Sequence, residues 1–216
     1  MRSIRCKGPR SAFTFIELLV SLALLALVMQ AAYDLARGGS KLFEATRLRN
    51  RMDTAAQRSG ARVVAGLEGA IAESLDPPLE DGESTSDLRF RHVLGLVGTA
   101  VQWGPLTRLA FEYAEGELDD GADNNGDGLV DEGVLVFTRD MGGAEEKRVV
   151  ICHDLAEYLA GEVFNGFDDN GNEMDDEQGF VIELRDGALI ARLTIQAIED
   201  GRVIEETVET TITLRN

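Results

Sequence analysis

The most strongly apolar part of the chain lies near its amino terminus. Between Phe13 and Ala32 the 20 residues are almost all hydrophobic, and Glu17 is the only charged one among them. Twenty residues in an α-helix rise about 30 Å, which matches the hydrocarbon core of a bilayer. The pattern therefore predicts that residues 13–32 form a membrane-spanning helix with one carboxylate near its end.

Helical spacing continues beyond this apolar run. Hydrophobic residues recur three, four or seven positions apart, or at near sums of these, and form the stripe Leu35, Leu42, Met52, Val63, Leu67, Ile71 and Leu75. We therefore predict one helix over residues 13–75, about 95 Å long. Its part outside the membrane, which we assign to residues 33–76, is expected to pack on a globular head. Gly38 and Gly39 favour a kink, and Pro77 with Pro78 is expected to end the helix.

The remainder of the chain, residues 79–216, contains short β-like segments separated by turn signals. The predicted strands are 88–93, 108–113, 134–138, 148–152, 180–184, 188–198 and 202–214. Asp-Gly pairs at 186–187 and 200–201 favour tight hairpins, and residues 154–159 are predicted to form a short helical turn. The pattern predicts an α+β fold, in which the long amino-terminal helix packs on the antiparallel sheet of the head.

Acidic residues give the chain a net charge of −18, from 39 Asp and Glu against 21 Lys and Arg. Twelve of these carboxylates lie in residues 119–132 and 168–177, and without them 27 acids against 21 bases would leave a charge of −6. So acidic a chain offers little that would neutralise phosphates, which argues against a nucleic-acid partner. Cys6 lies in the basic segment before the apolar run, so Cys152 would stand alone once that segment is removed, and no internal disulfide is expected.

Three hypotheses fit the amino-terminal segment. Residues 1–12 carry four basic residues and no acid. The segment could be a plain signal anchor with an incidental acid, or a secretory signal peptide cut near Ala31. Alternatively, cleavage between Ala12 and Phe13 frees an amine one helical turn from Glu17, and that cation would neutralise a carboxylate in lipid.

The third hypothesis agrees with a resemblance to a known family. Residues 7–12 (KGPRSA) followed by 13–20 (FTFIELLV) resemble the class III leader and mature start of type IV pilins and type II secretion pseudopilins. The resemblance implies that a prepilin peptidase cuts before Phe13 and methylates its amino group, and that Glu17 pairs with the amino terminus of a neighbouring subunit. The family usually has glycine where this chain has Ala12. The order of helix and strands and the ending TTITLRN also resemble minor pilins and minor pseudopilins.

The two acidic stretches repeat one pattern. Residues 121–132 (GADNNGDGLVDE) and 166–177 (GFDDNGNEMDDE) share G-x-D-(N/D)-N-G-(D/N)-x-x-x-D-E at an offset of 45 residues. Oxygens at alternate positions converge where glycines let the backbone curl, and Ca²⁺ prefers about six to eight oxygen ligands. We therefore predict one or two Ca²⁺ sites in the loops 119–133 and 165–179. The alternative is a pair of solvated acidic turns.

The predicted ligands are the residues at alternate positions and the acids that close each loop. They are Asp123, Asn125, Asp127, Leu129 (through its carbonyl), Asp131 and Glu132 in the first loop, and Asp168, Asn170, Asn172, Asp176 and Glu177 in the second. The first loop resembles the start of an EF-hand loop, with Gly128 as its invariant glycine, but its twelfth position is Val134 instead of Glu. Glu173 replaces that glycine in the second loop, which is expected to bind more weakly.

No motif indicates an enzyme. Cys152, His153 and Asp154 are consecutive, but neighbours along a strand point to opposite faces of a sheet. Cys152 is therefore expected to be a small core residue. The chain contains no phosphate-binding loop, dinucleotide fingerprint or catalytic-triad signature.

The sequence thus predicts a non-enzymatic minor pilin or minor pseudopilin that crosses the inner membrane once and has a periplasmic head. The expected partners are a prepilin peptidase, other pilin or pseudopilin subunits and the membrane, and the expected cofactor is Ca²⁺. The alternative is a membrane-anchored, calcium-dependent binding or adhesive protein that is not built into a filament.

Overall fold

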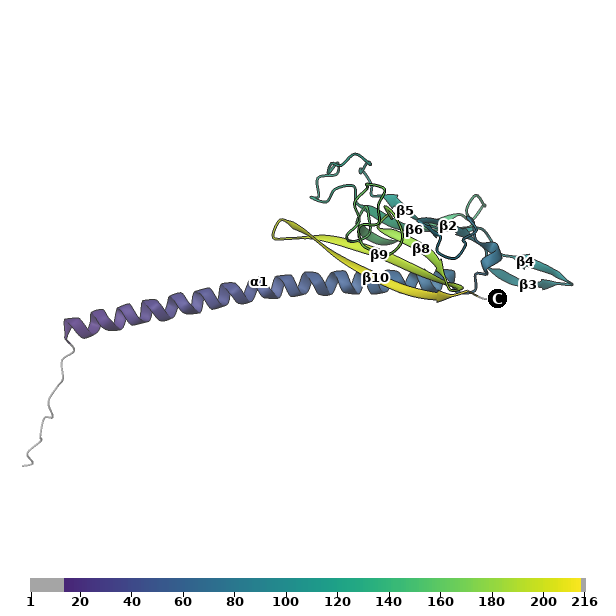
Figure 1. Cartoon of the computed structure of the whole chain (residues 1–216). Coiled ribbons are helices and arrows are strands. Elements are labelled where there is room, and N and C mark those ends of the chain that lie inside the picture. Colours follow the sequence, from purple (N-terminus) through teal and green to yellow (C-terminus); the bar gives the residue numbers. More distant parts are fainter. Residues whose placement is uncertain (1–13, 215–216) are drawn as a thin grey trace, which may run out of the picture. The chain divides into compact units, whose positions relative to one another are not determined.

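The computed structural model describes residues 14–214, and the contacts within the chain divide it into two units after Arg47. The helix α1, Phe15–Leu67, belongs to both, and its amino-terminal part is the whole secondary structure described for the first unit. The second unit, from Leu48 onward, contains the rest of α1, the 3-10 helix η1 (Ala72–Ser74) and ten strands (Figure 1).

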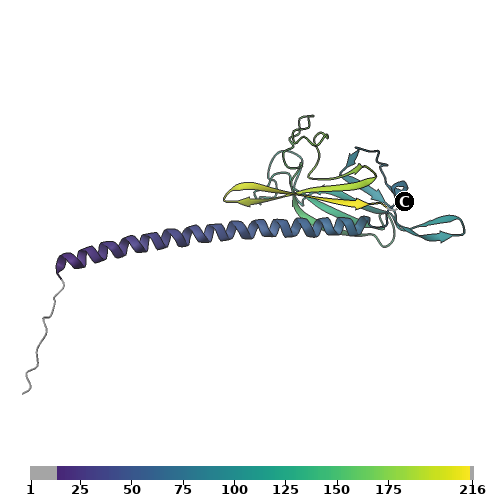
Figure 2. The same ribbon diagram turned by 60° about the horizontal axis from the view of Figure 1, so that its bottom comes forward.

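The strands of the second unit are all antiparallel. Their bounds are β1 Ser84–Thr85, β2 Asp87–Phe90, β3 Val93–Val97, β4 Ala100–Trp103, β5 Thr107–Tyr113, β6 Gly133–Arg139, β7 Lys147–Leu155, β8 Phe180–Arg185, β9 Ala188–Glu199 and β10 Arg202–Thr213. One sheet has the order β1-β8-β9-β7-β6-β5-β2, and β10 pairs with β9 off this path. The strands β3 and β4 form a separate two-stranded sheet that projects from the head (Figure 2). This arrangement confirms the α+β fold.

The hydrophobic core forms between the carboxyl-terminal part of α1 and the main sheet. Ala56, Val63 and Leu67 on α1 are at most 1% exposed and belong to one cluster with residues of β2, β5, β6, β7, β8 and β9. A Cβ on Gly66 would lie only 2.7 Å from Cε2 of Phe137, so glycine lets the helix approach β6 closely. Of the predicted stripe, Met52, Val63 and Leu67 are buried against the head, whereas Leu35 and Leu42 are 80% and 71% exposed.

The helix ends at Leu67, so the predicted continuation to Leu75 and the predicted stop at the two prolines were wrong. Gly69 has a φ of +86°, a left-handed conformation that glycine adopts without strain and that terminates many helices. Beyond it, Asp76 and Arg89 exchange two backbone hydrogen bonds of 2.8 Å each, which tie the chain to the edge of β2. Ile71 and Leu75, the last residues of the predicted stripe, therefore lie beyond the helix, on either side of the short turn η1.

The strands β5 to β10 lie within a few residues of the predicted strands. Both predicted hairpin turns are present, and their central residues, Asp186-Gly187 and Asp200-Gly201, all have φ between +50° and +76°. Such turns match the twist of the strands that they join. The second hairpin holds β9 and β10 in register over 12 residue pairs.

Two local predictions in the sheet were wrong. The strand predicted over 88–93 is divided, because β2 ends at Phe90 and Val93 begins β3, whose hairpin with β4 was not predicted. The helical turn predicted over 154–159 is absent, because β7 continues to Leu155, which pairs with Gly133 of β6 and Ile195 of β9. The pairing of β3 with β4 is a local hairpin, whereas at Leu155 pairing with the distant strands β6 and β9 decides the backbone conformation.

A buried charge cluster joins the three last strands. Glu183 on β8 is completely buried and accepts hydrogen bonds from Arg192 of β9 at 2.5 Å and from Arg185 at 2.6 Å. Arg192 also donates to Glu209 of β10 at 2.9 Å. The cluster therefore links β8, β9 and β10 side by side.

Replacing Arg192 with methionine is expected to destabilise the head by about 3 kcal/mol, because Glu183 would remain buried with one fewer cation. The matched control is Arg202→Met on the exposed start of β10, which is expected to change stability by less than about 0.5 kcal/mol. Urea unfolding of the full chain in detergent micelles measures both. Equal stability of the two variants would contradict the structural role of the cluster.

Candidate functional site

The amino-terminal part of α1 is an apolar helix without a buried face. Within residues 14–214, α1 is the one helix long and apolar enough to cross a membrane by length and composition, and none of its most apolar window is buried. Glu17 is the only charged residue between Thr14 and Tyr33. The helix is continuous through Gly38 and Gly39, where the sequence favoured a kink.

Glu17 participates in an amino-terminal cap that the sequence analysis did not identify. The backbone N–H and the hydroxyl of Thr14 donate to Oε2 of Glu17 at 2.8 Å and 3.0 Å, and the N–H of Glu17 donates to Oγ1 of Thr14 at 3.4 Å. This reciprocal arrangement is the capping box, whose T-x-x-E signature is present at 14–17. Ala12 and Phe13, the predicted cleavage site, lie outside the described residues.

In the head, the two acidic loops have the same backbone hydrogen bonds. The carboxylate of Asp131 accepts from the N–H groups of Asp120 and Gly121 at 3.3 Å and 2.7 Å. Forty-five residues later, that of Asp176 accepts from Asn165 and Gly166 at 2.8 Å and 2.7 Å. The loops are thus two copies of one structure as well as of one sequence pattern.

The acids at the third position of each pattern hold the curl of the loop. Asp123 accepts from the N–H groups of Gly126 and Gly128 at 2.6 Å and 2.9 Å. Asp168 accepts in the same way from Gly171 at 2.5 Å and from Glu173 at 2.8 Å. The hydrogen bond from the N–H of Glu173 has the largest effect on the pKa of Asp168 and lowers it. Burial opposes this effect, and the N–H of Gly171 lowers the pKa further. The backbone thus favours the ionised carboxylate there.

The repeat extends further than the sequence analysis recognised. Glu117 and Glu162 are also 45 residues apart, are 6% and 8% exposed, and each follows a glycine with positive φ. Oε1 of Glu117 accepts from the N–H of Asn125 at 2.7 Å, and Oε1 of Glu162 accepts from that of Asn170 at 2.9 Å. Comparing the five residues before each loop would have identified this Gly-Glu pair.

Several buried carboxylates in these loops lack partners. Of the six buried carboxylic acids in the described part of the head, Asp131, Glu132 and Glu177 belong to the loops, and Glu117 and Glu162 lie just before them. Oε2 of Glu132, Oε2 of Glu162 and both oxygens of Glu177 have no hydrogen-bond partner. Burial is the largest influence on the pKa values of Glu132 and Glu177, and it raises both. Buried oxygens without donors are costly, and a hard cation that accepts oxygen ligands would satisfy them.

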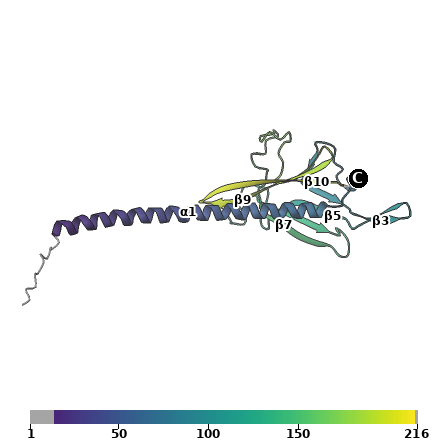
Figure 3. The same cartoon turned by 90° about the horizontal axis from the view of Figure 1, so that it is seen from below.

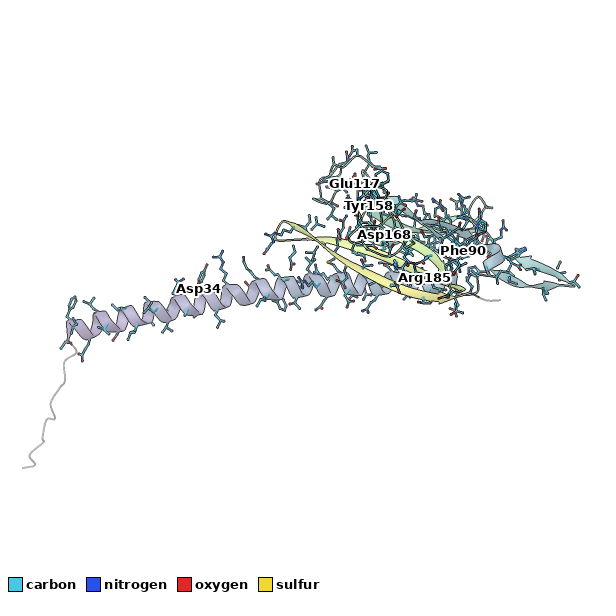
Figure 4. The ribbon with its side chains drawn as sticks, viewed as in Figure 1. Asp34, Phe90, Glu117, Tyr158, Asp168 and Arg185 are labelled. Atoms are coloured by element: carbon cyan, nitrogen blue, oxygen red, sulfur yellow. The ribbon has the colours of Figure 1, made fainter. Side chains whose placement is uncertain are left out.

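The two loops flank one aromatic side chain. Burial, together with the carboxylates of Glu157, Asp119 and Asp176, raises the pKa of Tyr158 to about 12. Asp119 belongs to the first loop and Asp176 to the second, so both loops lie close to Tyr158. Figure 4 labels this tyrosine with Glu117 of the first loop and Asp168 of the second. The candidate metal loops thus form one region of the head.

The predicted ligands occupy the turns of these loops in different environments. Asn125 and Asp127 accept backbone hydrogen bonds, as Asn172 does, and Leu129 is buried, so that its side chain anchors the loop. Nδ2 of Asn125 donates to Glu132 at 2.6 Å, which brings two predicted ligands together. Within residues 14–214 no three His, Cys, Asp or Glu side chains are already grouped as a metal cluster.

Cys152 lies where the sequence analysis placed it. Its side chain is 4% exposed and belongs to the core, and burial raises the pKa of its thiol. His153, its neighbour on β7, is exposed. The two side chains therefore lie in different environments on the strand.

Comparison with known proteins identifies the amino-terminal segment. Residues 8–33 match the family described as the prokaryotic N-terminal methylation motif. This motif is the class III prepilin leader of type IV pilins and pseudopilins, and it includes Phe13 and Glu17. No curated protein and no solved structure is significantly similar to the chain. The matched segment supports a membrane-anchored, extracytoplasmic subunit of the pilin or pseudopilin type that is processed by a prepilin peptidase.

Proposed function

We propose that the chain is a minor pilin or minor pseudopilin, built into a type IV pilus or a type II secretion pseudopilus. Cleavage before Phe13 and methylation of the new amine prepare it for assembly. Its helix then lies in the inner membrane, and its head lies in the periplasm until the subunit enters the filament. The head has no enzymatic role in this proposal.

The observation that carries the proposal is the methylation motif at residues 8–33, which includes the start of an apolar helix with one carboxylate. A lone acid in lipid is stabilised by an adjacent cation. The amine freed at Phe13 would be four residues before Glu17 in the sequence, so the free terminus of one subunit can neutralise the acid of its neighbour. This pairing would set the axial position of each subunit relative to the next.

The direct test is the amino-terminal mass of the protein recovered from native membranes. We expect a chain that begins at Phe13 and carries one added methyl group. The variant Ala12→Gly should be processed at least as completely, whereas Ala12→Leu should retain its leader. An intact leader in the unaltered protein, or a start near Ala32, would contradict the proposal.

The two acidic loops bind Ca²⁺ in this proposal. The unpartnered oxygens of Glu132, Glu162 and Glu177 support it, because a divalent cation would compensate buried carboxylates that no donor satisfies. The ligands are the loop residues predicted from the sequence, with Glu162 added in the second loop. Bound Ca²⁺ would order the two long loops and has no part in chemistry.

A second candidate function is calcium-dependent binding by a head that is only anchored in the membrane. Exposed apolar side chains beside the second loop favour it, since Val163, Phe164 and Phe167 are 62%, 74% and 70% exposed. Exposed hydrophobic groups that lie together commonly mark binding surfaces. The two functions are distinguished by whether the processed chain is recovered in a filament or remains in the membrane.

A further inference from the structure

The main sheet of the head is open between β7 and β9. These strands pair at a single position, Leu155 with Ile195, while β8 occupies the first half of the same edge of β9. Residues 147–154 of β7 and 196–199 of β9 therefore have strand edges without a neighbouring strand. Strand edges of this kind are able to pair with a further polypeptide segment.

The carboxyl-terminal part of α1 lies over this opening (Figure 3). Ser59 and Arg62 on α1 donate side-chain hydrogen bonds to the backbone carbonyl of Ile151 on β7, at 3.0 Å and 3.2 Å. A cavity of about 430 Å³ remains between α1, β7 and β9, and a second cavity of about 410 Å³ adjoins it at Arg62 and Ile151. We call the two cavities together the basic groove.

The basic groove is positively charged in a chain whose net charge is −18. Its walls carry five cations against the single carboxylate of Asp154, and these cations are Arg51, Arg58, Arg62, Arg139 and Lys147. In the part of the chain that the structure describes, none of the five forms an ion pair. Arg51, Arg58 and Arg62 line the cavity between β7 and β9, and Arg139 and Lys147 line the second cavity, so the groove concentrates unpaired positive charge.

A buried donor without a partner lies in the same wall. Gln196 on β9 lines the groove and is 6% exposed, and its Nε2 has no hydrogen-bond partner. A buried amide that donates to nothing is unfavourable, because it has lost its hydrogen bonds to water and gained none in return. An incoming carbonyl or carboxylate oxygen would satisfy it, so this side chain is a second, independent indication of a ligand with acceptor oxygens.

We infer that the basic groove binds an extended acidic segment of a partner polypeptide. The open edges of β7 and β9 supply backbone hydrogen bonds, as in other cases in which a peptide adds a strand to a sheet. The arginines pair with its carboxylates, and Gln196 donates to one of its oxygens. The strand edges favour a polypeptide over other polyanions. The inference concerns the head and does not depend on assembly into a filament.

The test uses the full chain in non-ionic detergent micelles and a fluorescent, capped hexaglutamate peptide, with binding measured by anisotropy. The peptide should bind, and a capped hexalysine peptide should not. The double reversal Arg51→Glu/Arg58→Glu should weaken binding about tenfold. The matched control Arg202→Glu reverses an exposed charge on β10 and should change binding by less than about twofold.

A second variant, Gln196→Leu, is expected to fold normally. It should weaken binding about threefold or more, while its melting temperature stays equal or rises because the unpartnered amide is removed. Equal weakening by Arg202→Glu would show non-specific attraction and overturn the inference. Displacement of the peptide by inorganic phosphate at the same concentration, or by a single-stranded oligonucleotide, would also overturn it, since the groove would then be a general anion site.

Discussion

Replacing Glu17 with glutamine is expected to reduce incorporation into filaments by on the order of 10- to 100-fold. Glutamine keeps the shape and the capping capacity of the residue at the third helical position, because Gln also completes a capping box. The change therefore removes only the negative charge. Without it, the amino terminus of the neighbouring subunit would be a cation in lipid with nothing to neutralise it. The ratio of filament-bound to membrane-bound protein measures the effect.

Thr14→Val is the matched control for this experiment. It removes the hydroxyl that donates to Glu17 and accepts from its N–H, and leaves the charge in place. If Glu17 acts by pairing between subunits, this variant should assemble within about twofold of the unaltered chain, since a lost cap weakens a helix only modestly. If Thr14→Val is impaired as strongly as Glu17→Gln, the capping box is the function of Glu17 and the pairing proposal is wrong.

Addition of about 10 mM Ca²⁺ is expected to raise the free energy of unfolding of the head by about 1.4–2.7 kcal/mol per site. The estimate takes dissociation constants of about 10⁻³ to 10⁻⁴ M, as in extracellular modules, and the mass-action stabilisation of a ligand that binds the folded state alone. Thermal unfolding of the full chain in detergent micelles, with chelator and with Ca²⁺, measures it. An unchanged melting temperature in Ca²⁺, or an equal shift with Mg²⁺, would contradict the proposed site.

A carboxylate-to-amide change in either loop should affect stability in opposite directions in chelator and in Ca²⁺. Glu132→Gln retains an acceptor for Asn125 and removes a buried negative charge whose second oxygen has no partner. In chelator it is expected to be as stable as the unaltered chain or more stable, whereas in Ca²⁺ it should lose the contribution of the first site. Glu177→Gln should behave likewise for the second site. Glu206→Gln, on an exposed position of β10, is the control and should change neither condition.

Patterns of neighbouring residues predicted much of this structure correctly. The apolar run with its lone Glu17, the hairpin turns at Asp186-Gly187 and Asp200-Gly201, and the curled acidic loops all depend on residues within a few positions of one another. Even the Gly-Glu pairs before the loops, which the sequence analysis missed, are visible as an extension of the same repeat. The capping box at Thr14 is equally local, and its omission was an oversight of a known signature.

Backbone conformation and strand pairing decided the remaining features. Gly69 and the pairing of Asp76 with Arg89 end α1 before its hydrophobic stripe does. The division at Phe90 and the projecting hairpin of β3 and β4 also depend on which strand each segment meets. Hydrophobic spacing shows that a residue will be buried, but it does not show which backbone conformation will bury it.

The sequence by itself predicted a membrane-spanning segment, a subunit of the pilin or pseudopilin type and the positions of the candidate metal ligands, because these predictions depend on local composition and spacing. The tertiary structure alone decided that Glu132, Glu162 and Glu177 carry buried oxygens without partners, and that β7 and β9 separate beneath arginines of α1. Both features arise where segments remote in the chain pack together, and burial and strand pairing are properties of that packing.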